Sequence, residues 1–114
     1  MESSANKAAT VNITYKNNST YDRSYTITYN GSAVDLSGDV LRMDIKKNRD
    51  DQSYLYRLST ADSSITVSGT SNNIITFNKQ MNLPNDTYYQ DLFNVTQVDY
   101  IWEGLFKIAR NITT

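Results

Sequence analysis

The sequence contains no cysteine and no histidine, and these two absences exclude much chemistry. Without cysteine there is no disulfide, no thiolate metal site and no cysteine nucleophile. Without histidine the chain lacks the commonest general base and the commonest transition-metal ligand. We therefore expect no catalytic residue, no metal and no cofactor, and we predict that the protein is not an enzyme.

The sequence also lacks an excess of either charge sign and has no long apolar run. The net charge is −1, and the 11 Lys and Arg residues are dispersed along the chain. This is a poor electrostatic footprint for nucleic acid. The first ten residues lack the apolar core of a signal peptide, and no later window reaches the length of a membrane span. We expect no nucleic-acid partner, no membrane segment and no export through a signal peptide.

The length of 114 residues accommodates one domain with a single hydrophobic core. Residues 1–10 are small and polar and show no periodicity, which predicts a flexible N-terminal arm. Residues 11–114 are expected to form a single β-sandwich domain.

Alternating apolar and polar residues predict about seven to eight short strands with turn signals roughly every ten residues. The dipeptide Asn30-Gly31 predicts a two-residue hairpin turn, because both central positions of that turn need a positive φ. We expect a polar turn over Lys16–Asp22 and a single helical turn over Lys79–Leu83. No long amphipathic helix is predicted. This pattern favours an all-β antiparallel sandwich, with a barrel as the alternative.

The most informative stretch, residues 82–108, predicts a hairpin rich in aromatic residues. Alternation places Tyr88, Gln90 and Leu92 on one face of its first strand, opposite Tyr89, Asp91, Phe93 and Val95. On its second strand one face is almost wholly apolar and consists of Tyr100, Trp102, Gly104, Phe106 and Ile108. A hairpin of this kind needs a second sheet to cover it. We expect core positions for Tyr25, Tyr29, Tyr88 and Tyr100.

Acidic residues at two places in the sequence could form a chemical site. Asp91 and Glu103 are expected on adjacent strands and could face each other, as the paired carboxylates of a glycosidase do. We interpret both as polar residues on the solvent side of their strands. The loop 48–51 offers oxygen ligands for calcium, but its spacing matches no known calcium loop.

Several motifs occur in a characteristic order. They are Tyr25-Thr26-Ile27-Thr28-Tyr29, Val34-Asp35-Leu36-Ser37-Gly38, Val40-Leu41-Arg42-Met43-Asp44-Ile45, Ile74-Ile75-Thr76-Phe77, Leu83-Pro84, Tyr88-Tyr89-Gln90-Asp91-Leu92 and Glu103-Gly104-Leu105-Phe106-Lys107-Ile108. In this order and spacing the chain resembles, over roughly residues 22–110, a family of small phage virion proteins. That family has an immunoglobulin-like β-sandwich and is related to the N-terminal domain of siphophage upper baseplate proteins.

The resemblance implies a non-enzymatic structural component of a tailed-phage virion, in the tail, neck, baseplate or a fibre-attachment adaptor. Its partners would be other virion proteins, in a homo-oligomer or a large symmetric assembly. Its location would be the virion, after assembly in the host cytoplasm. A capsid decoration or head-fibre protein remains a variant of this interpretation. A carbohydrate-binding module for host glycans and, last, a small hydrolase or inhibitor remain alternatives.

The contact residues are predicted from two features. The polar arm precedes a first strand that could add to a neighbour's sheet edge, which points to Val11, Ile13 and Tyr15. Tyrosine is enriched in interfaces because it buries a large area and still presents a hydroxyl. Tyr21 and Tyr54, in or beside predicted loops, complete the candidate interface.

Overall fold

The computed structural model describes residues 9–109, and eleven strands form most of that range. The elements are β1 (Ala9–Thr10), β2 (Ile13–Lys16), β3 (Thr20–Thr26), β4 (Thr28–Tyr29), β5 (Ser32–Ala33), β6 (Leu41–Lys46), β7 (Tyr56–Ser59), the 3₁₀ turn η2 (Thr60–Asp62), β8 (Ile65–Ser68), β9 (Ile74–Gln80), β10 (Thr87–Asn94) and β11 (Asp99–Ala109).

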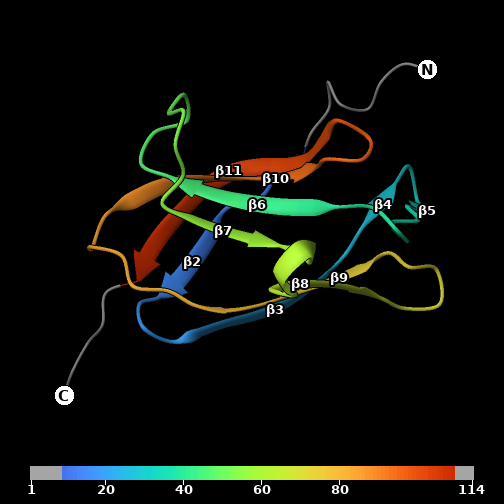
Figure 1. The fold of residues 1–114 in the computed structure, drawn as a ribbon, viewed down its shortest axis with the longest axis horizontal. Helices are drawn as coiled ribbons and strands as arrows, with labels where there is room; N and C mark the ends of the chain where they lie inside the picture. The colour runs from blue at the N-terminus through green and yellow to red at the C-terminus, as the bar shows by residue number, and fades with distance from the viewer. Residues whose placement is uncertain (1–8, 110–114) are drawn as a thin grey trace.

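The strands form two layers that enclose one core (Figure 1). One layer is a six-stranded sheet with the order β1-β11-β10-β6-β7, in which β2 also pairs with β11. The other is a three-stranded sheet with the order β3-β9-β8, and β4 and β5 make a separate small hairpin. All pairs are antiparallel except those of β1 and β2 with β11, which are parallel.

The strand order is that of an immunoglobulin-like sandwich. The order β3-β9-β8 reproduces strands B, E and D, and β7-β6-β10-β11 reproduces C′, C, F and G. A tyrosine corner is also present, because the Tyr88 hydroxyl at the start of β10 donates to the Pro84 carbonyl at 2.7 Å. The predicted all-β, antiparallel immunoglobulin-like fold is therefore confirmed, with the two parallel edge pairs as a local departure.

The core is aromatic at its centre. The Trp102 and Phe77 ring centroids, from opposite sheets, lie 6.0 Å apart, and Tyr25 packs edge-on against Trp102 at 4.8 Å. The Trp102 indole N–H donates to Gln90 Oε1 at 2.8 Å, which satisfies a polar group in this apolar space. Gln90, which is fully buried, in turn donates to the Val11 carbonyl at 2.6 Å. This chain of contacts fixes the N-terminal segment on the sandwich.

A β-bulge divides the aromatic hairpin. Leu92 lies opposite Trp102, whereas Phe93 lies opposite Tyr100, so that Ile101 is the extra residue on β11. The residues of β11 that precede Trp102 therefore point to the opposite faces from those that simple alternation predicts, because a bulge shifts the strand register by one residue. Tyr100 points outward and is 47% exposed, which corrects the prediction that it belongs to the core. Tyr88 is buried as predicted.

The predicted turns had mixed outcomes. Asn30 and Gly31 both have positive φ, 52° and 80°, and join β4 to β5 as a two-residue hairpin, which confirms that turn. This hairpin stands outside both sheets, so Tyr29 is 50% exposed, contrary to expectation. The polar turn at 16–22 is shorter than predicted, because β3 begins at Thr20 and pairs with β9. The prediction of a helical turn at 79–83 was wrong, because β9 continues as a strand to Gln80.

The N-terminal segment runs parallel to β11 and passes close to Gly104. Ala9 and Thr10, predicted to lie in the flexible arm, instead pair with Trp102 and Glu103. The rest of that arm, residues 1–8, lies outside the described residues. Beyond Asn12, β2 pairs with residues 106–109 in the same parallel register as β1.

Candidate protein-binding face

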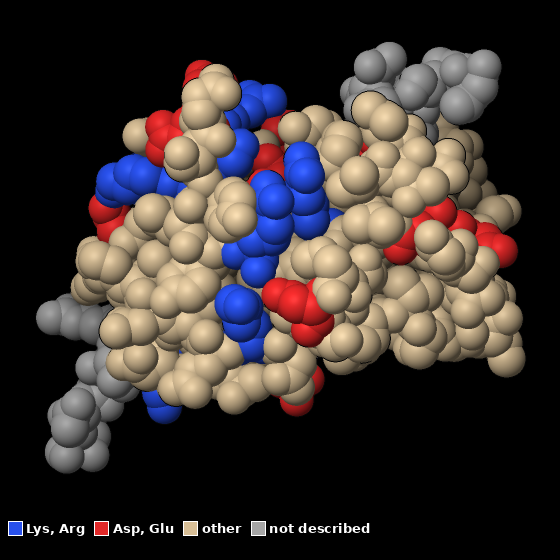
Figure 2. All heavy atoms as spheres, viewed as in Figure 1, with Lys and Arg blue, Asp and Glu red and all other residues tan. Residues whose placement is uncertain are grey.

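The solvent side of the six-stranded sheet carries charged and aromatic side chains. We call it the outer face and define it by residues of β6, β7, β10 and β11 together with Arg49 of the β6–β7 loop. Strand alternation buries Leu41, Met43 and Ile45 of β6 and directs the residues between them outward. In Figure 2, Lys and Arg atoms form a band across the middle of the view, over β6 and β7. The outer face consists of Arg42, Asp44, Lys46, Arg49, Arg57, Tyr89, Asp91, Phe93, Tyr100 and Glu103.

Three carboxylates form a row across this face. Asp91 on β10 lies directly opposite Glu103 on β11 and directly opposite Asp44 on β6. The prediction that Asp91 and Glu103 lie on adjacent strands and face each other is therefore confirmed. Like charges opposite one another destabilise a sheet by roughly 0.2–1 kcal/mol per pair. The row therefore needs cations around it.

The two outer members of the row have such partners. Arg57 binds Asp44 through two hydrogen bonds, Nε to Oδ1 at 2.6 Å and Nη2 to Oδ2 at 2.9 Å. Arg49 Nη2 lies 3.1 Å from Glu103 Oε1. The same oxygen accepts from the Tyr89 hydroxyl at 2.7 Å. Two-point Arg–carboxylate contacts are the stronger kind of ion pair, so the orientation of the Arg57 and Asp44 side chains is well defined.

Asp91, in the middle of the row, has an unfavourable environment. It is only 5% exposed, which corrects the prediction of a solvated polar residue. Burial raises the pKa of Asp91 above the ordinary aspartate value. The positive charge of Lys46 lowers this pKa in part, and the negative charge of Asp44 raises it further. At neutral pH an ionised Asp91 therefore costs stability. Carboxylates in such positions are often found where a protein binds something.

Aromatic rings are interleaved with the charges. The Phe93 and Tyr100 ring centroids lie 4.7 Å apart, and the Arg42 guanidinium lies 5.2 Å from the Phe93 centroid. The Arg49 guanidinium lies 6.0 Å from the Tyr89 ring. A hollow of about 300 Å³ lies among these groups, with Tyr89, Asp91 and Tyr100 in its lining. Exposed Tyr and Arg side chains of limited mobility are the groups that contribute most to protein interfaces.

The predicted interface residues lie mostly elsewhere. Ile13, Tyr15 and Tyr21 are each 2% exposed and belong to the core, so they are unavailable to a partner and this part of the prediction is corrected. Ile13 and Tyr15 were placed on a first strand and Tyr21 in or beside a loop, but β2 and β3 carry all three side chains into the core. Val11 is half-buried and its backbone bonds to Glu103. Tyr54 is 45% exposed, stacks against Arg57 at 4.0 Å and stays a candidate.

Sequence reasoning missed the most exposed aromatic residue of this face. Tyr100 was assigned to the core because the bulge at Ile101 could not be foreseen from one strand alone. Phe93, by contrast, was correctly assigned to the face opposite Leu92. Since Tyr100 pairs with Phe93, the position of Phe93 was the one sequence signal that pointed to this face. Arg42 alternates with the buried Leu41 and Met43 and lies on the solvent side of β6.

Metal and membrane sites were also sought within residues 9–109. That range holds no group of three acidic side chains arranged to bind a metal ion. In the loop 48–51, whose spacing matches no calcium loop, Asp51 accepts a hydrogen bond from the Asn48 amide at 3.0 Å. None of the helices in the described range is long and apolar enough to cross a membrane.

Comparisons with known proteins give little beyond the fold. No family model matches the chain, and no curated protein matches it. Among solved structures it is similar to a chain of the ZIG-8–RIG-5 IG1–IG1 heterodimer, with a TM-score of 0.37 and 14% sequence identity. That match covers 90% of this chain and 83% of the other. At this level of similarity it carries no argument about ancestry or function.

Proposed function

We propose that this chain is a structural component of a tailed-phage virion that works through protein–protein contacts and catalyses no reaction. The outer face is its principal contact surface. The phage assignment rests on the ordered motifs of residues 22–110. The contact surface rests on one observation, the clustering of exposed Tyr100 with Phe93 and Arg42 on the sheet and with Arg49 of the adjoining β6–β7 loop.

The geometry suits recognition of a protein better than recognition of a sugar. Glycan platforms need two or three coplanar exposed rings, whereas the Phe93 and Tyr100 planes are inclined by 56°. The face carries a row of three carboxylates flanked by Arg42, Arg49 and Arg57, so a partner with complementary charges would be held in one register. The partners would be other virion proteins, in a symmetric assembly or homo-oligomer.

The first experiment is an inventory of purified particles of the source virus by mass spectrometry, with copy number relative to the major capsid protein. About six, twelve or eighteen copies would support a neck, tail or baseplate position, because such assemblies follow ring symmetry. Hundreds of copies would support capsid decoration. Absence from the particle would refute the virion assignment.

The contact surface needs its own variants. Particles assembled with Tyr100→Ser or Arg42→Ser are expected to contain several-fold less of the protein. Arg23→Ser is the matched control, because Arg23 also lies over a ring, 5.6 Å from the Tyr21 centroid, but belongs to β3 in the other sheet. Equal incorporation of all three variants would exclude the outer face as the contact surface.

A further inference from the structure

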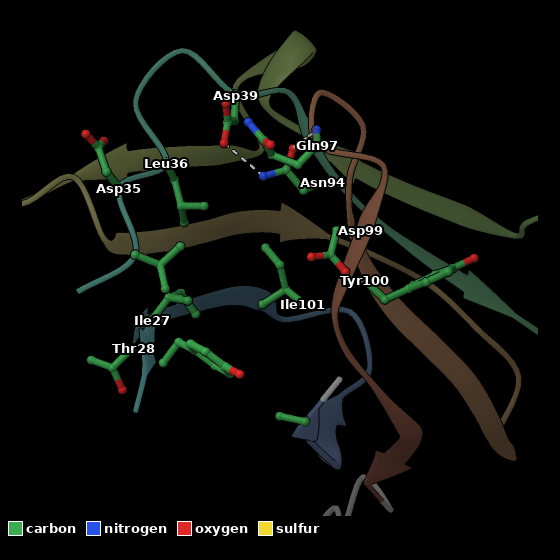
Figure 3. A pocket seen from close by; sticks show the side chains of 13 residues that line it. Ile27, Thr28, Asp35, Leu36, Asp39, Asn94, Gln97, Asp99, Tyr100 and Ile101 are labelled. Carbon is green, nitrogen blue, oxygen red and sulfur yellow. Dashed lines mark hydrogen bonds between the residues drawn. The ribbon is translucent and has the colours of Figure 1, made fainter. Parts of the chain in front are cut away.

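A second hollow lies at one end of the sandwich and is separate in position from the carboxylate row. It forms where the long connection between β3 and β6 meets the turn between β10 and β11 (Figure 3). Its volume is about 330 Å³, at the lower end of the range for ligand pockets. A pocket of this size accommodates one long side chain with part of its backbone.

The interior of the pocket is apolar. Ile27, Val34 and Ile101 line it; they are partly buried and pack against the core. Figure 3 shows Ile27, Leu36 and Ile101 arranged around one space. Because these side chains are only partly covered, the surface they leave open favours an aliphatic group over water.

The rim is acidic. Asp35, Asp39 and Asp99 line the pocket, and within residues 9–109 no lysine or arginine is among its lining residues. Asp39 is oriented by Asn94, whose Nδ2 donates to it at 2.9 Å. Hydrogen bonds from the Ser37 backbone and hydroxyl lower the pKa of Asp35, so that it is ionised at neutral pH.

The bulge at Ile101 determines the third acidic position. Asp99 lies opposite Asn94, which is buried on the inner side of the sheet, whereas Tyr100 lies opposite Phe93 on the outer face. In Figure 3 the side chains of Asp99 and Tyr100 point to opposite sides of β11. Without the extra residue Asp99 would lie on the outer face instead.

We propose that this pocket binds the side chain of a lysine or arginine residue of a partner protein. The aliphatic stem would lie against Ile27, Val34 and Ile101, and the cation would lie among the three aspartates. This occupant is the one whose chemistry matches both parts of the lining, an apolar interior and a rim of one charge. This inference rests on the proposed function in one respect: it assumes that the chain binds another protein, which supplies the lysine or arginine.

The test uses blocked tripeptides Ac-Gly-X-Gly-NH2 titrated into the ¹⁵N-labelled chain, with amide shifts followed by NMR. The residue X is lysine, arginine, norleucine or glutamate. Norleucine is the matched probe, because it retains the aliphatic stem and lacks the ammonium group. We expect millimolar binding of the lysine or arginine peptide, with shifts confined to residues 27–39 and 94–101. The norleucine and glutamate peptides are expected to bind at least about fivefold more weakly.

Two variants locate the cation. The variants Asp39→Asn and Asp99→Asn are each expected to weaken binding of the lysine or arginine peptide about threefold, because each removes a negative charge and keeps the shape of the side chain. Asp39→Asn also keeps an oxygen to accept from Asn94. Asp22→Asn, on the exposed surface of β3, is the control and is expected to leave binding unchanged.

Several results would overturn the inference. Equal binding of the norleucine peptide would show a merely apolar pocket, and binding unchanged by both aspartate variants would place the cation elsewhere. Absence of saturable shifts at the pocket would show that no side chain of this kind binds. None of these outcomes bears on particle incorporation, which tests the proposed function separately.

Discussion

Gly104→Ala is expected to be the most destabilising single-methyl change in the described part of β11. A Cβ at this position would lie 2.0 Å from the Val11 carbonyl oxygen and 2.9 Å from Asn12 Oδ1. Ordinary contacts of a Cβ begin near 3.4 Å, so the N-terminal segment would have to move by more than an ångström. The obstacle is backbone, which cannot rotate away as a side chain can.

The cost follows from what holds that segment in place. Three hydrogen bonds converge there: the Val11 amide to the Glu103 carbonyl at 3.0 Å, Gln90 Nε2 to the Val11 carbonyl at 2.6 Å, and the Leu105 amide to Asn12 Oδ1 at 3.0 Å. Each contributes about 1 kcal/mol. Displacing the segment would also leave the buried Gln90 amide without its acceptor. We therefore expect a loss of about 3 kcal/mol in the free energy of unfolding, and a fall in Tm on the order of 10–20 °C.

Urea denaturation followed by tryptophan fluorescence is the appropriate assay, because Trp102 is buried and bonded to Gln90. Gly31→Ala is the matched control. Its Cβ would meet no atom within 4 Å, so it carries only the cost of a left-handed conformation at φ +80°, about 1 kcal/mol. If Gly104→Ala destabilised the protein no more than Gly31→Ala, the argument from steric overlap would be refuted.

Two further predictions concern single polar groups. Tyr88→Phe removes the hydroxyl that bonds the Pro84 carbonyl and is expected to cost about 1 kcal/mol, measured as a shift in the urea midpoint without a change in slope. Asp91→Asn is expected to stabilise the protein by about 1 kcal/mol at pH 7, because the folded state raises the pKa of Asp91 and so disfavours its ionised form. This gain should disappear as the pH falls below about 4, where the carboxyl is protonated in both states. An equal gain at pH 3 would contradict the electrostatic explanation.

Much of the fold could be predicted because its signals are local. The alternation of Leu41, Met43 and Ile45 with charged residues is typical of a strand with one buried face, and the structure buries all three. The Asn30-Gly31 hairpin was predicted because few residue pairs adopt two successive positive φ angles. Such features depend on a few adjacent residues, so the sequence alone specifies them.

The candidate sites were harder to predict because they depend on pairing between distant strands. Asp44 has the sequence environment of a solvent-facing residue, yet it is buried because Arg57 covers it from β7. Tyr21 has the composition of a turn residue, yet β3 pairs with β9 and carries its ring into the core. In both positions a partner more than ten residues away decides exposure.

The bulge at Ile101 connects the two proposed contact surfaces. Because alternation along a strand is strict, one extra residue inverts the orientation of every residue before it and none after it. Trp102 and Phe106 therefore keep their core positions, while Tyr100 joins Phe93 on the outer face and Asp99 joins the pocket. Removing the extra residue would exchange Tyr100 and Asp99 and so disrupt both surfaces at once. Substitution of Asp99 tests the pocket alone and leaves the register of β11 intact, whereas Tyr100 lines both hollows, so that its substitution is expected to perturb both surfaces.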